Sequence, residues 1–243
     1  MLRFLPALAL LSACHIRLHD HVSVDGVRLP AEHEEVLTLS EWPAGGLVIE
    51  AHQGDVSVEH SEGATTITVL VLERTHGEAH AHMEGGRLVV RAPNDAKCAI
   101  GRVLVRTSAA PHGLELGTGM GDVRLDGVPV SGRLRLSTGM GDVDVRAAGE
   151  PGTIELTTGM GDISAIGLCC ARFEAATGMG DVSVDGLEAS ELAELSSGLG
   201  DVEVERSKGG RIKADTGLGD VDLVESSFTA RDLDTGLGSV RER

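Results

Sequence analysis

Two groups of residues in this 243-residue chain carry side chains that commonly bind metal ions, at spacings that could bring them together. The first is the segment HGEAHAH, from His76 to His82. Alternate side chains of a strand point to the same face, so His80 and His82 would lie together, and His76 or Glu78 could complete a metal site. The alternative is a solvated loop, because the chain holds ten histidines in all. The segment therefore predicts either a small metal site or an exposed polar stretch.

The second group is a set of six aspartates that recur every 19 or 20 residues, namely Asp122, Asp142, Asp162, Asp181, Asp201 and Asp220. In stacked repeats their carboxylates would form a column, as in calcium-binding β-rolls. Those β-rolls, however, use a short Gly-Gly-x-Gly-x-Asp unit, whereas this chain supplies one aspartate per repeat. An aspartate beside a glycine corner commonly accepts its own backbone N–H groups, as in an Asx-turn. We therefore expect amides to hold the carboxylates, calcium to matter little and no cofactor to be required.

The elements that must position these residues follow from the repeat itself. Each corner has the pattern Gly-Met-Gly-Asp or Gly-Leu-Gly-Asp, except that Ser239 replaces the last aspartate, and apolar and polar residues alternate on both sides of it, which indicates strands. Twenty residues without a helix are too few for a propeller blade, which needs about 40. The sequence thus predicts an all-β, single-chain β-solenoid, similar to a parallel β-helix, with coils of about 20 residues. The second glycine of each corner, where φ > 0 or close approach is expected, is Gly121, Gly141, Gly161, Gly180, Gly200, Gly219 or Gly238.

Two further columns accompany the aspartates. One alternates between methionine and leucine: Met120, Met140, Met160, Met179, Leu199, Leu218 and Leu237. Because leucine replaces methionine at three positions, packing at the core or at a partly exposed corner is favoured over metal binding. The other column, Thr118, Thr138, Thr158, Thr177, Ser197, Thr216 and Thr235, predicts hydroxyls bonded to each other or to corner amides. Between the repeats, only Glu188-Ala189-Ser190-Glu191 is compatible with a helical turn.

The pattern divides the chain into four parts. Residues 1–13 are predicted to be a signal peptide, and 14–46 a tether with N-terminal strands that form an irregular cap. Residues 47–110 contain apolar runs without the regular corner and are predicted to form irregular β coils. Residues 111–243 contain the regular solenoid repeats. Terminal units of a stack are commonly atypical because they cover an open end.

The chain start, MLRFLPALALLSA, has one positive charge followed by a short apolar run, which is typical of a secretory signal. A bilayer-spanning helix would need about 20 apolar residues. Leu11-Ser12-Ala13-Cys14, at the end of this stretch, resembles the lipobox of bacterial lipoproteins, which implies that Cys14 becomes the lipidated first residue, carrying acyl chains such as palmitate. His15 stands where some inner-membrane lipoproteins have aspartate, which favours the outer membrane. The alternative is an ordinary secreted protein with an incidental cysteine.

The Gly-Asp-Val/Ile corners, each preceded by an alternating strand, resemble the adhesin-like domains of unknown function found in bacterial envelope proteins. The resemblance extends from about Leu47 to Arg243 and includes an early corner, Gln53-Gly54-Asp55-Val56-Ser57-Val58. It implies a β-solenoid fold and an envelope location. It transfers no catalytic residues.

Composition limits the partners. A net charge of −17 disfavours nucleic acid, which requires a basic surface. Cys98, Cys169 and Cys170 have no zinc-site spacing and could form one intramolecular disulfide at most, so small buried or partly buried side chains are favoured. Sugar-binding enzymes usually stack aromatic residues on their substrates, yet aromatic residues make up only 2% of this chain.

Taken together, these features predict a non-enzymatic cell-envelope lipoprotein that is adhesin-like or a scaffold. Its expected partners are the membrane, through the lipid on Cys14, and an unknown envelope or extracellular ligand. Two alternatives stay open: a cation-binding envelope module that uses the aspartate column, and a carbohydrate-active enzyme. The sequence contains no Gly-x-Ser-x-Gly, His-Glu-x-x-His or P-loop motif that would favour an enzyme.

Overall fold

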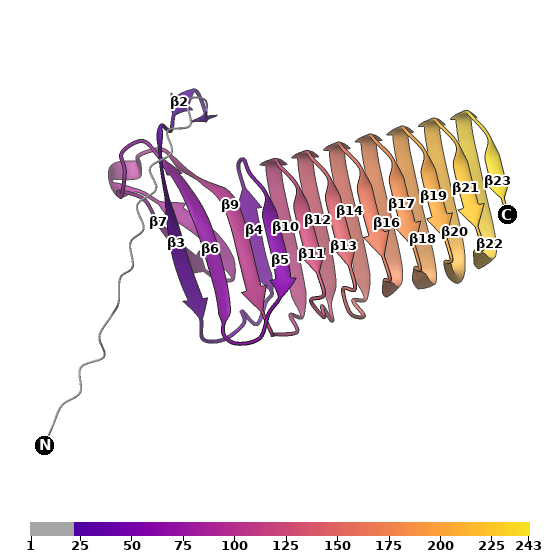
Figure 1. The fold of residues 1–243 in the computed structure, drawn as a ribbon, viewed down its shortest axis with the longest axis horizontal. Coiled ribbons are helices and arrows are strands. Elements are labelled where there is room, and N and C mark those ends of the chain that lie inside the picture. The colour runs from indigo at the N-terminus through magenta and orange to yellow at the C-terminus, as the bar shows by residue number, and fades with distance from the viewer. Residues whose placement is uncertain (1–21) are drawn as a thin grey trace, which may run out of the picture.

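The computed structural model describes residues 22–243, which wind into a β-solenoid with an irregular cap at its N-terminal end (Figure 1). Most strands belong to two sheets, one of 10 strands and one of 11. Each turn of the chain adds one parallel strand to each sheet, with a register step of 20 residues between the first regular coils. The predicted fold class, an all-β solenoid with coils of about 20 residues, is confirmed.

A single coil shows how the sequence forms its two strands. β12 (Arg133–Met140) and β13 (Val143–Arg146) are joined by a two-residue corner. Leu134 in the first strand and Val143 in the second are fully buried, whereas the residues between the buried positions are partly or fully exposed. Because alternate side chains point to opposite faces, each strand has one apolar face, and the two apolar faces of a coil pack against each other.

The remaining regular coils repeat this pair. The long strands belong to the 10-stranded sheet: β10 (Gly113–Met120), β14 (Thr153–Met160), β16 (Cys169–Met179), β18 (Glu188–Leu199), β20 (Lys208–Leu218) and β22 (Ser227–Leu237). The short strands belong to the 11-stranded sheet: β11 (Val123–Asp126), β15 (Ile163–Ile166), β17 (Val182–Asp185), β19 (Val202–Glu205), β21 (Val221–Val224) and β23 (Val240–Glu242). The expected helical turn at 188–191 is wrong, because these residues begin β18, and Glu188 and Ala189 pair with both neighbouring coils.

The first coil of the stack precedes the regular repeats. It consists of β4 (Leu47–Ala51) and β5 (Val56–His60), which pair in parallel with β10 and β11. The early corner at Gly54 and Asp55 therefore lies directly beside the first regular corner, and its Gly54 N–H donates to the carbonyl of Met120 at 2.6 Å. This coil connects the solenoid to the cap.

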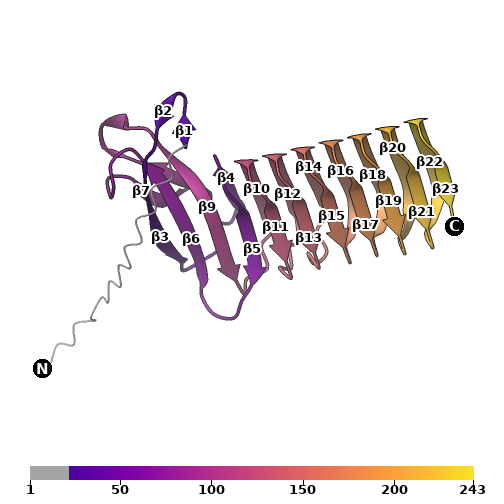
Figure 2. The same cartoon turned by 45° about the horizontal axis from the view of Figure 1, so that its top comes forward.

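The cap extends both sheets at the end opposite the C-terminus (Figure 2). In the 11-stranded sheet, β9 (Cys98–Thr107) pairs with β5, then β6 (Thr65–Glu73) and β3 (Ala31–Leu39) follow as antiparallel strands. In the 10-stranded sheet, β8 (Arg87–Arg91) follows β4, and β7 (His80–Glu84) is the last strand. The hairpin of β1 (Ser23–Val24) and β2 (Val27–Arg28) and a 3-10 turn at Pro93–Asp95 lie outside the two sheets.

Corner glycines are required because neighbouring coils approach closely. Gly180 has φ = +138°, a backbone conformation that other residues rarely adopt. A Cβ atom there would overlap the backbone carbonyl of Gly161 in the preceding coil. The predicted reasons for a glycine, positive φ and contact with the adjacent rung, therefore both hold at this corner.

The methionine–leucine column lies on the outside of the corners. Its members are 39% exposed at Met120 and 71% at Leu237, with the others between these values. It therefore belongs to the partly exposed corner and not to the core. Among residues 22–243, no helix has the length and apolarity needed to cross a membrane.

Candidate functional site

The aspartate column is held by backbone amides, and each amide comes from the following coil. Oδ1 of Asp142 accepts the N–H of Asp162 at 2.9 Å, and Oδ1 of Asp162 accepts the N–H of Asp181 at 2.8 Å. The same bond links Asp55 to Asp122 at one end and Asp220 to Ser239 at the other, at 3.0 and 2.8 Å. Amide capping was expected within a single turn. The parallel register instead places the next aspartate's N–H beside each carboxylate.

Arginines pair with both ends of the aspartate column. Arg124 contacts Asp122 at 2.6 Å, and Arg241 contacts Asp220 at 2.8 Å. Carboxylates one strand spacing apart, about 4.8 Å, repel by roughly 1 kcal/mol per pair in bulk water. Charge-assisted hydrogen bonds from the amides offset this repulsion.

The threonine column is satisfied by the same stacking. Oγ1 of Thr138 donates to the carbonyl of Gly121 at 2.8 Å, and Oγ1 of Thr158 donates to the carbonyl of Gly141 at 2.9 Å. The bond partner is therefore a corner carbonyl of the preceding coil, and not a neighbouring hydroxyl or an amide as expected. Both polar columns use hydrogen bonds that repeat from coil to coil.

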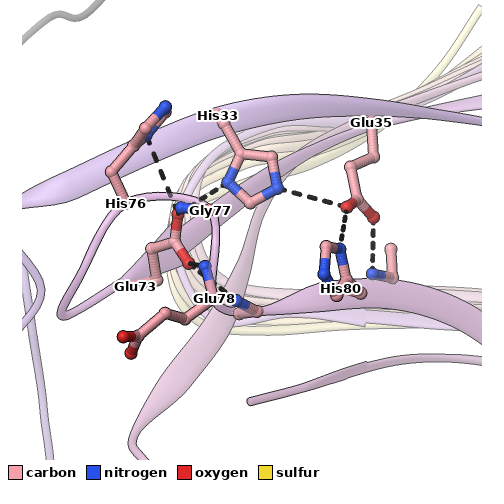
Figure 3. Close-up of polar contacts among 9 residues, drawn as sticks. His33, Glu35, Glu73, His76, Gly77, Glu78 and His80 are labelled. Carbon is pink, nitrogen blue, oxygen red and sulfur yellow. Dashed lines mark hydrogen bonds and ion pairs between the residues drawn. The ribbon is translucent and has the colours of Figure 1, made fainter. Parts of the chain in front are cut away.

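The cap holds a different kind of arrangement, which we call the cap cluster: His33, Glu35, Glu73, His76 and His80. His33 and Glu35 come from β3, Glu73 ends β6, and His80 begins β7. Figure 3 shows the ring of His33 between the two carboxylates, with His80 beside Glu35. The cluster therefore joins the last strands of the two sheets.

Glu73 is the most buried member of the cap cluster, with only 1% of its side chain exposed. Its Oε1 accepts the N–H of Gly77 at 2.5 Å, and its Oε2 accepts the N–H groups of Glu78 and Ala79 at 2.9 and 2.8 Å. Nδ1 of His33 lies 2.7 Å from Oε1. One buried carboxylate thus fixes the turn between β6 and β7 and orients the His33 ring.

Glu35 connects β3 to β7. Its Oε2 accepts the N–H of Ala81 at 2.6 Å. Its Oε1 lies 2.7 Å from Nδ1 of His80 and 3.2 Å from Nε2 of His33. Two imidazole nitrogens therefore converge on one carboxylate oxygen.

Both carboxyl groups of the cap cluster have lowered pKa values. Burial acts to raise the pKa of Glu73, but hydrogen bonds from Ala79, Gly77 and His33 outweigh it. Burial likewise acts to raise the pKa of Glu35, and the bonds from His80, Ala81 and His33 outweigh it. Both groups are therefore carboxylates at neutral pH and act only as acceptors or ligands.

The structure brings together only part of the predicted histidine site. Nδ1 of His76 lies 3.9 Å from Oε1 of Glu73, and its ring meets the His33 ring edge-on with centroids 5.7 Å apart. His82 instead pairs with Glu84 at 2.7 Å, and Arg91 also binds Glu84. The hydrogen bonds from Arg91 and His82 lower the pKa of Glu84 to about 2. His82 shares a strand with His80 but contributes nothing to the cap cluster.

Sequence reasoning did not identify His33, Glu35 or Glu73. A signal exists for Glu73, because it continues the buried alternation of Thr65, Ile67, Val69 and Val71 in β6. A charged residue at a position that the period of two assigns to the core requires partners. The antiparallel pairing of β3 with β6, which brings residues 40 apart into contact, has no counterpart in the repeat.

The cysteines are free thiols within the described residues. Cys98 and Cys169 are partly buried and Cys170 is buried, as expected for small packed side chains. Burial, with a contribution from Cys169, raises the pKa of Cys170 to about 12, which keeps this thiol protonated. Cys14, the predicted lipidation residue, lies outside the described residues.

A shallow groove of about 800 Å³ crosses the starts of β16, β18, β20 and β22. Its lining includes the apolar side chains of Cys170, Ala189 and Phe228. Glu188 and Lys208 also border it and form an ion pair of 2.8 Å with each other.

Comparisons with known proteins agree with the fold. The family model of the Toastrack DUF4097 domain matches residues 27–241. A solved structure from Bacteroides fragilis, described as a putative adhesin, shares 16% identity, with a TM-score of 0.56, and the match covers 87% of this chain and 97% of that one. A putative adhesin and a putative lipid binding protein from Parabacteroides distasonis give TM-scores of 0.49 and 0.48 at 14% and 12% identity. Each match covers 87% of this chain, with 97% and 96% of the other. No curated protein matches the chain.

Proposed function

The chain belongs to the Toastrack DUF4097 family, and we propose that it is a non-enzymatic, adhesin-like or scaffolding protein of the bacterial cell envelope. One observation carries the proposal: the chain forms a rod of in-register coils with the cap at one end and the last coil at the other. The polar columns along the rod are satisfied by hydrogen bonds between coils. Such a body is suited to holding a surface at a distance from its anchor.

A lipid on Cys14 would place the anchor on the cap side of this rod. Cys14 precedes β3, whereas β22 and β23 lie at the opposite end. At about 4.8 Å per coil, the seven regular coils extend roughly 30 Å beyond the cap. We propose that the membrane is the bacterial outer membrane and that the coils project away from it.

The adhesin role is proposed by analogy with a structural relative. The Bacteroides fragilis protein is described as a putative adhesin, and at 16% identity its likeness concerns the fold. What supports the same role here is the exposed methionine–leucine column, which follows the corners along the whole stack. Contiguous exposed apolar side chains on a soluble surface commonly mark an interaction site.

The anchor is tested by replacing its attachment residue. Cells that produce the Cys14→Ser chain should release it or retain it unprocessed, and lipid labelling should be lost. The control is Cys98→Ser, which removes a partly buried thiol downstream and should leave labelling intact. Labelling of the Cys14→Ser chain equal to that of the unchanged chain would overturn the anchor.

The role of the rod in attachment is tested by shortening it in register. Deleting residues 122–161 joins Gly121 to Asp162, restores a Gly-Asp corner and removes two coils. Cells from which the gene for this protein has been deleted should attach less well to surfaces than unchanged cells. Production of the full chain in these cells should restore attachment, and production of the shortened chain should restore less of it. Equal attachment with and without the protein would contradict the proposed function.

A further inference from the structure

We propose that the cap cluster binds one Zn²⁺ ion through Nε2 of His33, Oε1 of Glu35 and Nδ1 of His80. The ion would cross-link β3 and β7, the last strands of the two sheets. The proposal of a zinc site does not rest on the proposed adhesin-like role.

The geometry of the three donor atoms carries the proposal. They lie within 4.8 Å of one another, with 3.2 Å from Glu35 Oε1 to His33 Nε2 and 2.7 Å from Glu35 Oε1 to His80 Nδ1. Zinc bonds of about 2.0–2.1 Å in a tetrahedron place neighbouring ligand atoms roughly 3.3 Å apart. The first separation already matches, and the second requires an increase of about half an ångström at the exposed His80 ring.

Glu73 supplies the support that a zinc-binding histidine usually has. It accepts three backbone N–H groups, so its oxygens remain acceptors and Nδ1 of His33 must donate to it. In the neutral ring, Nε2 then carries the lone pair and points toward Glu35. A carboxylate that orients a histidine from behind is the common outer-shell arrangement at zinc sites.

The charges around the site also favour a cation. A His33 ring protonated at both nitrogens donates to both carboxylates, whereas a neutral ring that keeps its proton on Nδ1 turns the lone pair of Nε2 toward Oε1 of Glu35. A divalent ion can take the place of the Nε2 proton and bind both atoms, and its charge balances those of Glu35 and Glu73. The aspartate column offers no comparable arrangement, because it contains no imidazole and a backbone amide already donates to each Oδ1.

The donor set selects the metal class. Two imidazole nitrogens and one carboxylate oxygen suit Zn²⁺ and related transition-metal ions, whereas calcium and magnesium prefer sets of oxygens. Exposure provides the entry path, since the side chain of His80 is 71% exposed while Glu35 and His33 are 20% and 16% exposed. Three protein ligands leave one tetrahedral position for water.

The experiment is a zinc titration of the full-length chain, purified in mild detergent and stripped with a chelator. Calorimetry should give one Zn²⁺ per chain, and zinc should raise the melting temperature. Glu35→Gln and His80→Ala should each weaken the affinity about tenfold or more, because each removes one of three ligands. The matched control is His82→Ala, which lies on the same strand but pairs with Glu84, and it should stay within about twofold of the unchanged chain.

His80→Ala keeps the test decisive even if changes at the less exposed His33 disturb folding, because the His80 side chain is largely exposed. Far-UV circular dichroism verifies that this variant is folded. Saturable binding at one equivalent that His80→Ala weakens and His82→Ala does not would support the site. Absence of saturable binding, or weak binding of several ions that both variants retain, would overturn it.

Discussion

The regular coils and the cap are built from the same stacked strands but use polar residues in opposite ways. In the coils the corner aspartate and the threonine column recur from turn to turn and bond to the neighbouring coil, as Asp162 and Thr158 do. In the cap the members of the cap cluster occur once and converge from β3, β6 and β7 on a single place. Repetition therefore indicates a structural role here, whereas a non-repeating convergence marks the place where chemistry is expected.

The coils and the cap should also differ in how they are stabilised. A stacked coil contacts only its neighbours, so its stability is a sum of similar local terms. The cap instead depends on a few buried groups whose partners are far apart in sequence, such as Glu73 and His33. Changes in the two regions should therefore differ in size and in their dependence on pH and metal.

The largest expected effect is at a corner glycine. Gly180→Ala should lower the free energy of unfolding by about 3 kcal/mol or more, because strain at positive φ adds to a backbone clash with Gly161. Gly167→Ala is the matched control: φ is also positive, but no atom lies within 4 Å of the new Cβ, so about 1 kcal/mol is expected. Urea unfolding measures both, and equal losses would contradict close stacking at the corner.

The next largest change in the free energy of unfolding is expected at Glu73, the buried carboxylate of the cap cluster. Glu73→Gln should cost about 2–3 kcal/mol at pH 7, because it replaces a charged acceptor of three amides. The folded-state pKa of Glu73 is lowered, so its contribution is present above the unfolded pKa of about 4.3 and is lost as the pH falls through the folded pKa. The difference in unfolding free energy between the two chains, measured in urea, should therefore narrow progressively as the pH falls below about 4.3. A gap of unchanged size would show that the charge of Glu73 does not support the turn.

A smaller effect is expected in the aspartate column. Asp162→Ala removes the acceptor of the Asp181 N–H and should cost about 1 kcal/mol. Asp162→Asn keeps a side-chain oxygen and removes repulsion from the neighbouring carboxylates, so a change within about 0.5 kcal/mol is expected. If asparagine proves as costly as alanine, the column needs its charge and the amide account is incomplete.

The smallest effect is expected in the methionine–leucine column. Met160 is 43% exposed, so Met160→Ser should change the free energy of unfolding by about 0.5 kcal/mol or less. Thermal melting measures the change. A loss of several kcal/mol would assign this column to the core and remove its availability as a contact surface.

The coils were predicted well because the spacing of the repeat determines which residues pair between neighbouring strands. A step of 20 residues places Leu134 beside Leu114 and Ile154, and the alternation assigns them to the core. The cap cluster could not be predicted in the same way. His76 and His80 were identified, but His33 and Glu35 reach them only through the antiparallel pairing of β3 with β6, which no spacing specifies. His82 was grouped with them by strand alternation alone, while its partner is Glu84.

We expect specific cation binding in the cap and not in the coils. Thermal melting of the full-length chain in EDTA, in zinc, in calcium and in sodium of matched ionic strength distinguishes the two regions. A ligand that binds only the folded state must raise the melting temperature with its concentration. We predict a zinc-specific rise that His80→Ala abolishes and that Asp162→Asn with Asp181→Asn leaves intact. A calcium-specific rise that disappears in the double asparagine variant would contradict the account.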